Sequence, residues 1–269
     1  MAQKTRVGQD MPAIHERRTA AANAAFLARH LQPGMSLLDC GCGPGTITIG
    51  LAEWVAPGKV TGVDLDPKRV QQATEAAEAA GAANVHFQVG DVYQLPFPDA
   101  SFDVAFMTYV LMHLKDRQSA VDEVMRVLKP GGIVAAREMN HSAVIHLNAA
   151  PEWWEAVPLL DDYLKSRGID IFAGATLGAL VRDAGFTDVE ESASFASGVG
   201  GDNNTPEVRS FAAEQQARRL ETTVADWAVK EGLAERADLE RMAKGIREWT
   251  HGDEFSASAM QEVVGWKPR

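Results

Sequence analysis

Short apolar runs alternate with alanine-rich, charged segments between residues 35 and 139, and this alternation restricts the chain to few folds. The apolar runs predict strands at 35–40, 59–65, 84–89, 102–109 and 133–139. The segments between them predict helices at 46–55, 67–80 and 119–128, each followed by glycine or Pro-Gly. Nearly continuous apolar strands are typical of parallel strands covered on both faces. We therefore expect an α/β fold with a doubly wound, mostly parallel sheet.

The regular alternation stops after about residue 140. Elsewhere the sequence predicts an N-terminal helix at 12–31, a helix at 176–184, a largely helical charged stretch at 206–249, strands at 188–197 and 255–266, and a mobile Gly/Asn-rich loop at 197–205. A length of 269 residues suits one generous domain. We therefore treat 1–269 as a single domain that begins with a helical segment at 1–34.

Composition argues against several classes of function. The 37 acidic and 26 basic residues give a formal net charge of −11, and an acidic chain repels phosphate backbones, so we expect no nucleic-acid partner. No run of 18 apolar residues occurs and the N-terminus is polar, so we expect no signal peptide and no membrane partner. Cys40 and Cys42 are too close to pair, and a zinc site would need a second pair of ligands. We therefore expect reduced thiols, no metal and a cytoplasmic location.

The segment Leu37–Thr46 joins the first predicted strand to the first predicted helix. After Asp39 it places glycines at three alternate positions, which allow a tight turn and let a ligand approach the backbone closely. Ligands of open α/β sheets bind at the carboxyl ends of strands. A dinucleotide site would need a third glycine where Thr46 stands, and Asp39 would repel a pyrophosphate. A nucleotide-cofactor oxidoreductase is therefore the alternative rather than the main hypothesis.

The stretch Asp39–Gly45 resembles the first motif of class I S-adenosylmethionine-dependent methyltransferases, most closely those of the ubiquinone/menaquinone type that act on small molecules. Four further stretches resemble the later motifs of that family in the expected order, at 63–66, 90–97, 101–114 and 126–132. The resemblance implies a seven-stranded sheet whose last strand, at about 255–267, is antiparallel. It also implies a helical cap over the carboxyl edge, formed by the N-terminal segment and by insertions at 140–172 and 200–250.

The resemblance also assigns the nucleoside part of the cofactor. Asp64 ends the second predicted strand, where a carboxylate can bind both ribose hydroxyls. Leu65 is expected to pack on the adenine ring. Asp91 is expected to face the adenine amino group, and Val92 to donate its backbone N–H.

The methionine part of the cofactor is expected beside Met107 and Thr108, at the end of the fourth predicted strand. Arg18 is a candidate partner for the cofactor carboxylate, with an ordinary solvated helix arginine as the alternative. The complete set of expected cofactor contacts is Arg18, Asp39, Gly41, Cys42, Gly43, Gly45, Thr46, Asp64, Leu65, Asp91, Val92, Met107 and Thr108.

His113 and His141 are candidates for a general base, because each follows a predicted strand at the ligand-facing edge of the sheet. A structural role is the alternative for both, since a sulfonium is already a strong electrophile and positioning can supply most of the acceleration. Comparable further candidates are His146, Glu138 and Tyr109. Trp153 and Trp154, together with His141, are candidates for the acceptor pocket, and core packing explains the tryptophans equally well.

The resemblance therefore predicts transfer of a methyl group from S-adenosylmethionine to an O, N or C nucleophile of a small aromatic or apolar molecule, with release of S-adenosylhomocysteine. We expect a secondary-metabolism enzyme that acts as a monomer or homodimer. The alternatives are the oxidoreductase, a non-catalytic protein that retains the cofactor pocket, and an enzyme that methylates proteins.

Overall fold

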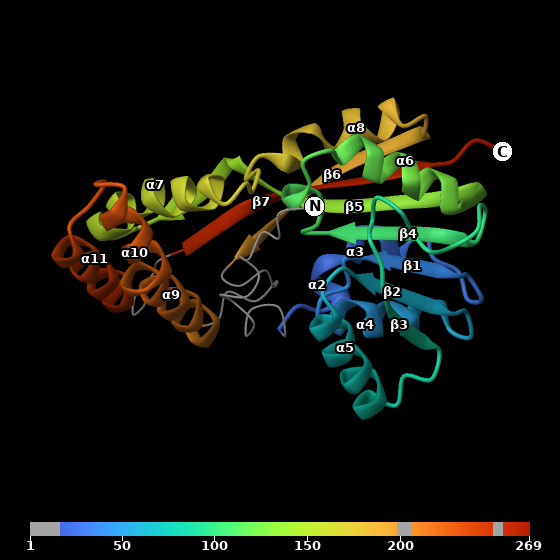
Figure 1. Cartoon of the computed structure of the whole chain (residues 1–269), viewed down its shortest axis with the longest axis horizontal. Coiled ribbons are helices and arrows are strands. Elements are labelled where there is room, and N and C mark those ends of the chain that lie inside the picture. The colour runs from blue at the N-terminus through green and yellow to red at the C-terminus, as the bar shows by residue number, and fades with distance from the viewer. Residues whose placement is uncertain (1–16, 198–205, 250–254) are drawn as a thin grey trace.

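The computed structural model describes residues 17–197, 206–249 and 255–269, and the strands in these ranges form one sheet. They are β1 (Leu37–Cys40), β2 (Val60–Asp64), β3 (Val85–Val89), β4 (Phe102–Thr108), β5 (Leu128–Leu147), β6 (Thr187–Ser197) and β7 (Phe255–Trp266). Their order across the sheet is β3-β2-β1-β4-β5-β7-β6 (Figure 1). The strands β1 to β5 pair in parallel, and β7 runs antiparallel to β5 and β6. The predicted fold class is confirmed.

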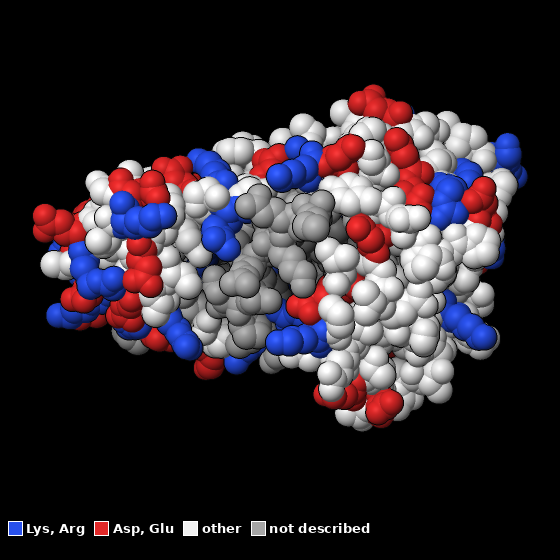
Figure 2. Space-filling model, in the orientation of Figure 1, with Lys and Arg blue, Asp and Glu red and all other residues white. Residues whose placement is uncertain are grey.

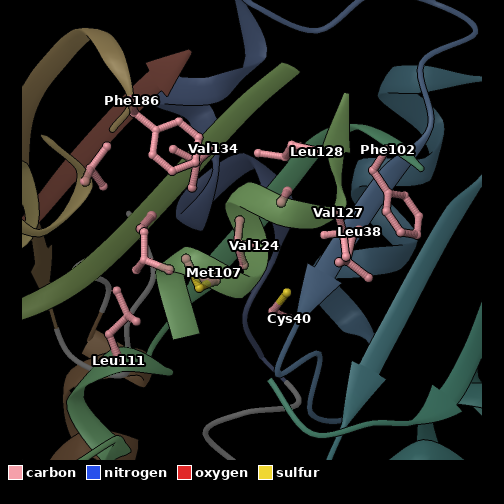
Figure 3. Close-up of a cluster of buried hydrophobic side chains, with 14 of the residues drawn as sticks. Leu38, Cys40, Phe102, Met107, Leu111, Val124, Val127, Leu128, Val134 and Phe186 are labelled. Carbon is pink, nitrogen blue, oxygen red and sulfur yellow. The ribbon is translucent and has the colours of Figure 1, made fainter. Parts of the chain in front are cut away.

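Helices cover both faces of the sheet. Those in the described residues are α2 (Ala20–Asn23), α3 (Ala25–Ala28), α4 (Thr46–Val55), α5 (Pro67–Ala80), η2 (Leu111–His113), α6 (Arg117–Val127), α7 (Pro151–Ser166), η3 (Ala173–Thr176), α8 (Leu177–Asp183), α9 (Pro206–Glu221), α10 (Thr223–Lys230) and α11 (Arg236–Trp249). The helices α6 and α8 pack on one face, around a core that includes Leu38 and Val134 (Figure 3). The helices α2, α3 and α4 pack around Leu37 and Phe106 on the other face. None of the helices described here is long and apolar enough to cross a membrane.

The helix α5 shows how local sequence sets the limits of an element. The Asp66 carboxylate accepts a hydrogen bond from the Lys68 backbone N–H at 3.0 Å, and Pro67 occupies the first turn, where its missing N–H costs nothing. Gly81 ends the helix with a φ of +67°, a left-handed conformation that glycine adopts readily. The structure confirms the predicted bounds of this helix.

The continuous N-terminal helix predicted at 12–31 is wrong where the structure describes it. The chain forms the two short helices α2 and α3, which are interrupted at Ala24. The buried Asn23 side chain donates to the Thr19 carbonyl and accepts a hydrogen bond from Arg137 on β5. The bond from Arg137 is a tertiary contact, and it overrides the helix propensity of the alanine-rich sequence. Residues 12–16 lie outside the described part of the chain, as do residues 198–205 of the predicted mobile loop.

The predicted end of the fifth strand at residue 139 is also wrong, because β5 continues to Leu147. The last pair with β4 is Thr108 with Arg137, and beyond it β5 continues as one edge of a three-stranded arm in the order β5-β7-β6. The register shifts between Asn140 and Val144, so residues 141–143 form an irregularity in the arm. Pairing with the distant strand β7 thus extends β5 beyond the apolar run from which it was predicted.

Four helices form a second apolar cluster at the end of this arm, on the left of Figure 1. The helices α7, α9, α10 and α11 bury Leu160, Leu220 and Ile246 against one another. Ion pairs join them at the surface, where Arg241 of α11 bonds Glu155 of α7. Figure 2 shows acidic and basic side chains interspersed over this end of the molecule, as expected for a solvated surface. We call this group the helical cluster.

Substitution of Leu38 by alanine is expected to lower the free energy of unfolding by ~2–5 kcal/mol, because the side chain is fully buried in β1 and its loss leaves a cavity. Urea denaturation measures the change. The matched control is Leu233→Ala, whose side chain is 51% exposed and which should cost less than about 0.5 kcal/mol. Equal losses for both variants would contradict the assignment of the core.

Candidate cofactor and acceptor site

The glycine-rich loop leaves β1 and enters α4 with φ of +77° at Gly41, +55° at Gly43 and +81° at Gly45. A Cβ atom at Gly41 would collide with the Val110 side chain, and one at Gly45 would lie 2.8 Å from Ala73. A Cβ at Gly43 would meet no protein atom within 4 Å. Two of the glycines are therefore required by packing, and the middle one borders open space in which a ligand can approach the backbone.

Asp64 ends β2 and organises this loop. One carboxylate oxygen accepts the Gly43 backbone N–H at 3.0 Å, and the other accepts the Asp66 backbone N–H at 2.9 Å. Burial raises the pKa of the Asp64 carboxyl above its usual range. Each oxygen keeps a further lone pair, so the carboxylate can still accept hydrogen bonds from two hydroxyl groups. The sequence analysis missed this second task of Asp64 in holding the loop.

Asp39 lies inside the sheet rather than at its surface. Its carboxylate accepts a hydrogen bond from the Thr48 hydroxyl of α4 at 2.6 Å, and burial raises its pKa to about 7. Thr48 is a residue that sequence reasoning missed, because a threonine inside an apolar helix carries no distinctive signal. Asp39 therefore ties the strand to the helix on one side of the loop.

The side chains of Cys40, Cys42 and Met107 point into the core. Cys40 and Met107 lie in the cluster under α6 (Figure 3), and Cys42 packs against Phe87 and α5. Burial raises the pKa of both thiols, so neither is a reactive thiolate at neutral pH. The contacts predicted for Cys42 and Met107 are therefore restricted to their backbone atoms.

The other residues predicted to contact the nucleoside surround an apolar surface that follows β2 and β3. Leu65 is 51% exposed, although it is a large apolar residue next to Asp64. Asp91 accepts the Tyr93 backbone N–H at 3.0 Å, which leaves its other oxygen for a ligand. Val92 is partly buried and packs against the core. An exposed leucine beside a carboxylate fits a flat apolar ring that carries an amino group.

A group of buried polar atoms lies at the end of β4 and beside it on β5. The Arg18 guanidinium stacks 3.6 Å from the centre of the Tyr109 ring, and Glu138 accepts the backbone N–H groups of Val110 and Leu111, both at 2.7 Å. Among the shielded atoms that have no hydrogen-bond partner within the described ranges, three lie here, namely Arg18 Nε, Thr108 Oγ1 and Glu138 Oε2. Buried polar atoms are normally paired, so these positions fit a polar ligand such as the amino-acid part of the expected cofactor.

The candidate bases occupy different environments. Burial, aided by the charge of Arg18, lowers the pKa of His113 to about 4. The Nδ1 atom of His141 lies 3.0 Å from a carboxylate oxygen of Asp161 on α7. His146 accepts a hydrogen bond from the Trp153 indole at 3.2 Å. Asp161 carries no sequence signal, because it is one of several charged residues along a helix.

The predicted acceptor residues are brought together only in part. Trp153 packs against the helical cluster, whereas Trp154 is 53% exposed and lies edge-on to His146 at 5.1 Å between ring centres. No group of three or more His, Cys, Asp or Glu side chains in the described ranges could hold a metal ion.

The comparisons with known proteins agree with this geometry. The family described as "Methyltransferase domain" matches residues 31–172. An uncharacterized methyltransferase of Schizosaccharomyces pombe is 36% identical over 47% of this chain and 48% of its own length. The demethylmenaquinone methyltransferase of Lactococcus lactis is 34% identical over 58% of this chain and 68% of its own length. The chain spans about half the length of the first curated relatives that it matches.

Among solved structures, a phosphoethanolamine N-methyltransferase of Haemonchus contortus in complex with S-adenosylhomocysteine has a similar fold. Its TM-score is 0.57 at 21% identity, over 93% of this chain and 53% of that one. The sheet order and the glycine-rich loop thus define the class I, S-adenosylmethionine-dependent methyltransferases. Because the family match covers more than half of the sequence, this chain belongs to the methyltransferase domain family.

Substitution of Gly43 by alanine is expected to weaken S-adenosylhomocysteine binding at least ~10-fold, because the new methyl group enters the ligand's space. The matched control is Gly81→Ala, which has a similar positive φ and equally open surroundings but ends α5. Both variants should lose about 1 kcal/mol of stability from backbone strain. Calorimetric titration that finds equal affinities for the two variants would remove Gly43 from the site.

Glu138 is expected to make the stability of the cofactor-free protein depend on pH. Burial raises its pKa to about 7, above the value in the unfolded chain, so its contribution to stability is present at low pH and is lost as pH rises through about 7. Glu138→Gln should therefore reduce the stability lost between pH 5 and pH 8 by about 2–3 kcal/mol. Urea denaturation at both pH values tests this, and the exposed Glu78→Gln should leave the pH dependence unchanged.

Proposed function

We propose that this protein transfers a methyl group from S-adenosylmethionine to an O, N or C nucleophile of a small aromatic or apolar molecule. One observation carries the proposal, namely that Arg18 Nε, Thr108 Oγ1 and Glu138 Oε2 are shielded and unpartnered in the described part of the chain. They lie at the edge of the sheet where the open space at Gly43 admits a ligand. A charged amino-acid group with donors and acceptors matches these atoms.

The proposed cofactor contacts follow the edge of the sheet. Asp64 holds the ribose hydroxyls, Leu65 supports the adenine ring, and Asp91 with the Val92 backbone recognises the ring edge. Arg18 pairs with the carboxylate of the methionine part. Bound in this way, the cofactor supplies an electrophilic methyl group, and the protein's contribution is to position the acceptor and exclude water.

The helical cluster, with segments 140–172 and 200–250, serves as the proposed cap. The Arg17 guanidinium lies 4.1 Å from the centre of the Phe211 ring on α9, while the adjacent Arg18 stacks on Tyr109 of the core. The N-terminal segment therefore touches both the cap and the cofactor site. The acceptor then lies between them, where Trp154 offers an exposed aromatic surface.

An aromatic or apolar acceptor is supported by these side chains and by the name of the Lactococcus lactis relative, which acts on demethylmenaquinone. We further propose a cytoplasmic protein of secondary metabolism, active as a monomer or homodimer. The family match favours this transferase over a nucleotide-cofactor oxidoreductase.

Thermal and urea unfolding with S-adenosylmethionine, S-adenosylhomocysteine, NAD and NADP tests the cofactor. The sulfur compounds should add ~2.7 kcal/mol of stability at about 100 times their dissociation constants, and the nicotinamide compounds should add none. Asp64→Ala should weaken S-adenosylhomocysteine binding by ~1.5–3 kcal/mol, since it removes charged acceptors. Stabilisation by NAD or NADP alone would overturn the proposal. Binding without methyl transfer to any acceptor would instead identify a non-catalytic cofactor-binding protein.

A further inference from the structure

Among the candidate bases in the described part of the chain, His141 is bonded to a carboxylate, that of Asp161. We propose that His141 and Asp161 form a base dyad that removes the proton from a phenolic or enolic hydroxyl of the acceptor, so that the acceptor atom is oxygen. This inference rests on the proposed function, because it concerns the acceptor of the same methyl transfer.

The geometry of the pair is that of an oriented imidazole. His141 Nδ1 lies 3.0 Å from Asp161 Oδ1, so the carboxylate selects the tautomer with the proton on Nδ1. The lone pair is then on Nε2, and no residue of the described ranges bonds that atom. The side chains of His141 and Asp161 are only 17% and 24% exposed, so the pair is shielded yet still reached by solvent. The carboxylate stabilises the imidazolium that forms when Nε2 takes a proton.

The dyad borders the polar atoms of the proposed cofactor site. His141 lies two residues beyond Met139 on β5, inside the irregularity of the strand, so contacts rather than strand alternation define its position. Arg137 lies 6.0 Å from the Tyr109 ring, and Met139 packs in the same apolar cluster as Tyr109. The His141 backbone N–H bonds the carbonyl of Ile171, another member of that cluster, at 3.0 Å.

Asp161 approaches the cluster from the cap. Leu164, one turn further along α7, packs in the cluster that contains Tyr109 and Met139. Tyr109 in turn lies under the Arg18 guanidinium. An acceptor that lies on this apolar cluster therefore has the polar cofactor atoms on one side and His141 on the other. Such a surface accommodates an aromatic body, and the base reaches a hydroxyl at its rim.

The other two histidines are poorer bases. Burial and the nearby charge of Arg18 lower the pKa of His113 to about 4. A base with so low a pKa is ineffective in taking a proton from a phenol. Burial lowers the pKa of His146 as well, and the nearby charge of His141 lowers it further. The Trp153 indole N–H already occupies the Nδ1 lone pair of His146. The described residues thus place two titratable groups, Asp161 and His146, against the imidazole of His141.

The step balances without any further reactant. The hydroxyl proton moves to Nε2 of His141 as an oxygen lone pair forms the bond to the methyl carbon, and the carbon–sulfur bond breaks with its electron pair left on sulfur. The positive charge of the sulfonium is thereby lost, and a positive charge appears on the imidazolium of His141. The carboxylate of Asp161 neutralises this new charge. Release of this proton to solvent restores the base.

The experiment uses the full chain with phenols of graded acidity as probes, from phenol to 4-cyanophenol and 4-nitrophenol. His141→Gln should lower methyl transfer at pH 8 to un-ionised phenol by about 100-fold, the usual contribution of a general base, and should affect the largely ionised 4-nitrophenol less than about five-fold. Asp161→Asn should show the same dependence on acidity with smaller losses. The matched control Asp162→Asn, on the same helix and 57% exposed, should leave the rates unchanged.

A second measurement needs no cofactor. In ¹⁵N imidazole NMR spectra, the signals missing from His141→Gln identify His141. The wild-type signals should show the neutral tautomer with the proton on Nδ1, a preference that Asp161→Asn should weaken and Asp162→Asn should not. Equal rate losses for all phenols, or the same tautomer in the wild-type and Asp161→Asn proteins, would overturn the dyad. If the wild-type protein binds S-adenosylhomocysteine but methylates no phenol, the hydroxyl assignment is wrong and the proposed function stands. If it does not bind S-adenosylhomocysteine, the proposed function itself is wrong.

Discussion

The strand β1 is only four residues long and fully buried, and the rest of the molecule depends on its position between β2 and β4. The chain leaves β1 toward β2 on one side and returns through β4 on the other, so the loops that follow β1 and β4 separate at the carboxyl edge. They touch at Gly41, where Val110 leaves no space for a side chain, and they have diverged at Gly43. The open space at Gly43 is therefore a consequence of strand order, and the carboxylate of Asp64 holds the Gly43 backbone in place beside it.

The elements that could be predicted from sequence are those whose limits are determined by neighbouring residues, such as helix caps and turn glycines. The bounds of α5 follow from Asp66, Pro67 and Gly81, and the glycine-rich loop follows from spacing alone. The break at Ala24 and the extension of β5 to Leu147 could not be predicted, because both depend on partners far along the chain. For β5 that partner is β7, more than a hundred residues away.

The same distinction applies to the site. Carboxylates at strand ends, such as Asp64, are visible in a sequence, since strand, turn and helix patterns surround them. Thr48 and Asp161 are not visible, because each lies within a helix whose pattern is explained by packing or solvation. Such side chains bond partners that the fold brings close, and the spacing of residues in the sequence does not show which partners these are.

Several charged side chains are buried beside the carboxyl edge, among them Arg137, Glu138 and Glu262. Arg137 is satisfied by Asn23, Ser194 and Glu262, so the charge of this strand is compensated within the protein. Burying such groups costs stability unless every atom is paired, and three unpaired atoms, Arg18 Nε, Thr108 Oγ1 and Glu138 Oε2, lie at the proposed cofactor site. A ligand that bonded these atoms, as proposed above, would offset that cost.

The irregularity at residues 141–143 has a mechanical consequence for the helical cluster. The arm of β5, β6 and β7 carries that cluster, and its hydrogen-bond ladder with β7 is interrupted only where β5 shifts register. A sheet ribbon bends most easily where its ladder is interrupted. His141 lies within this irregularity. If the cluster bends about this point, the proposed base and the proposed cap would therefore move together.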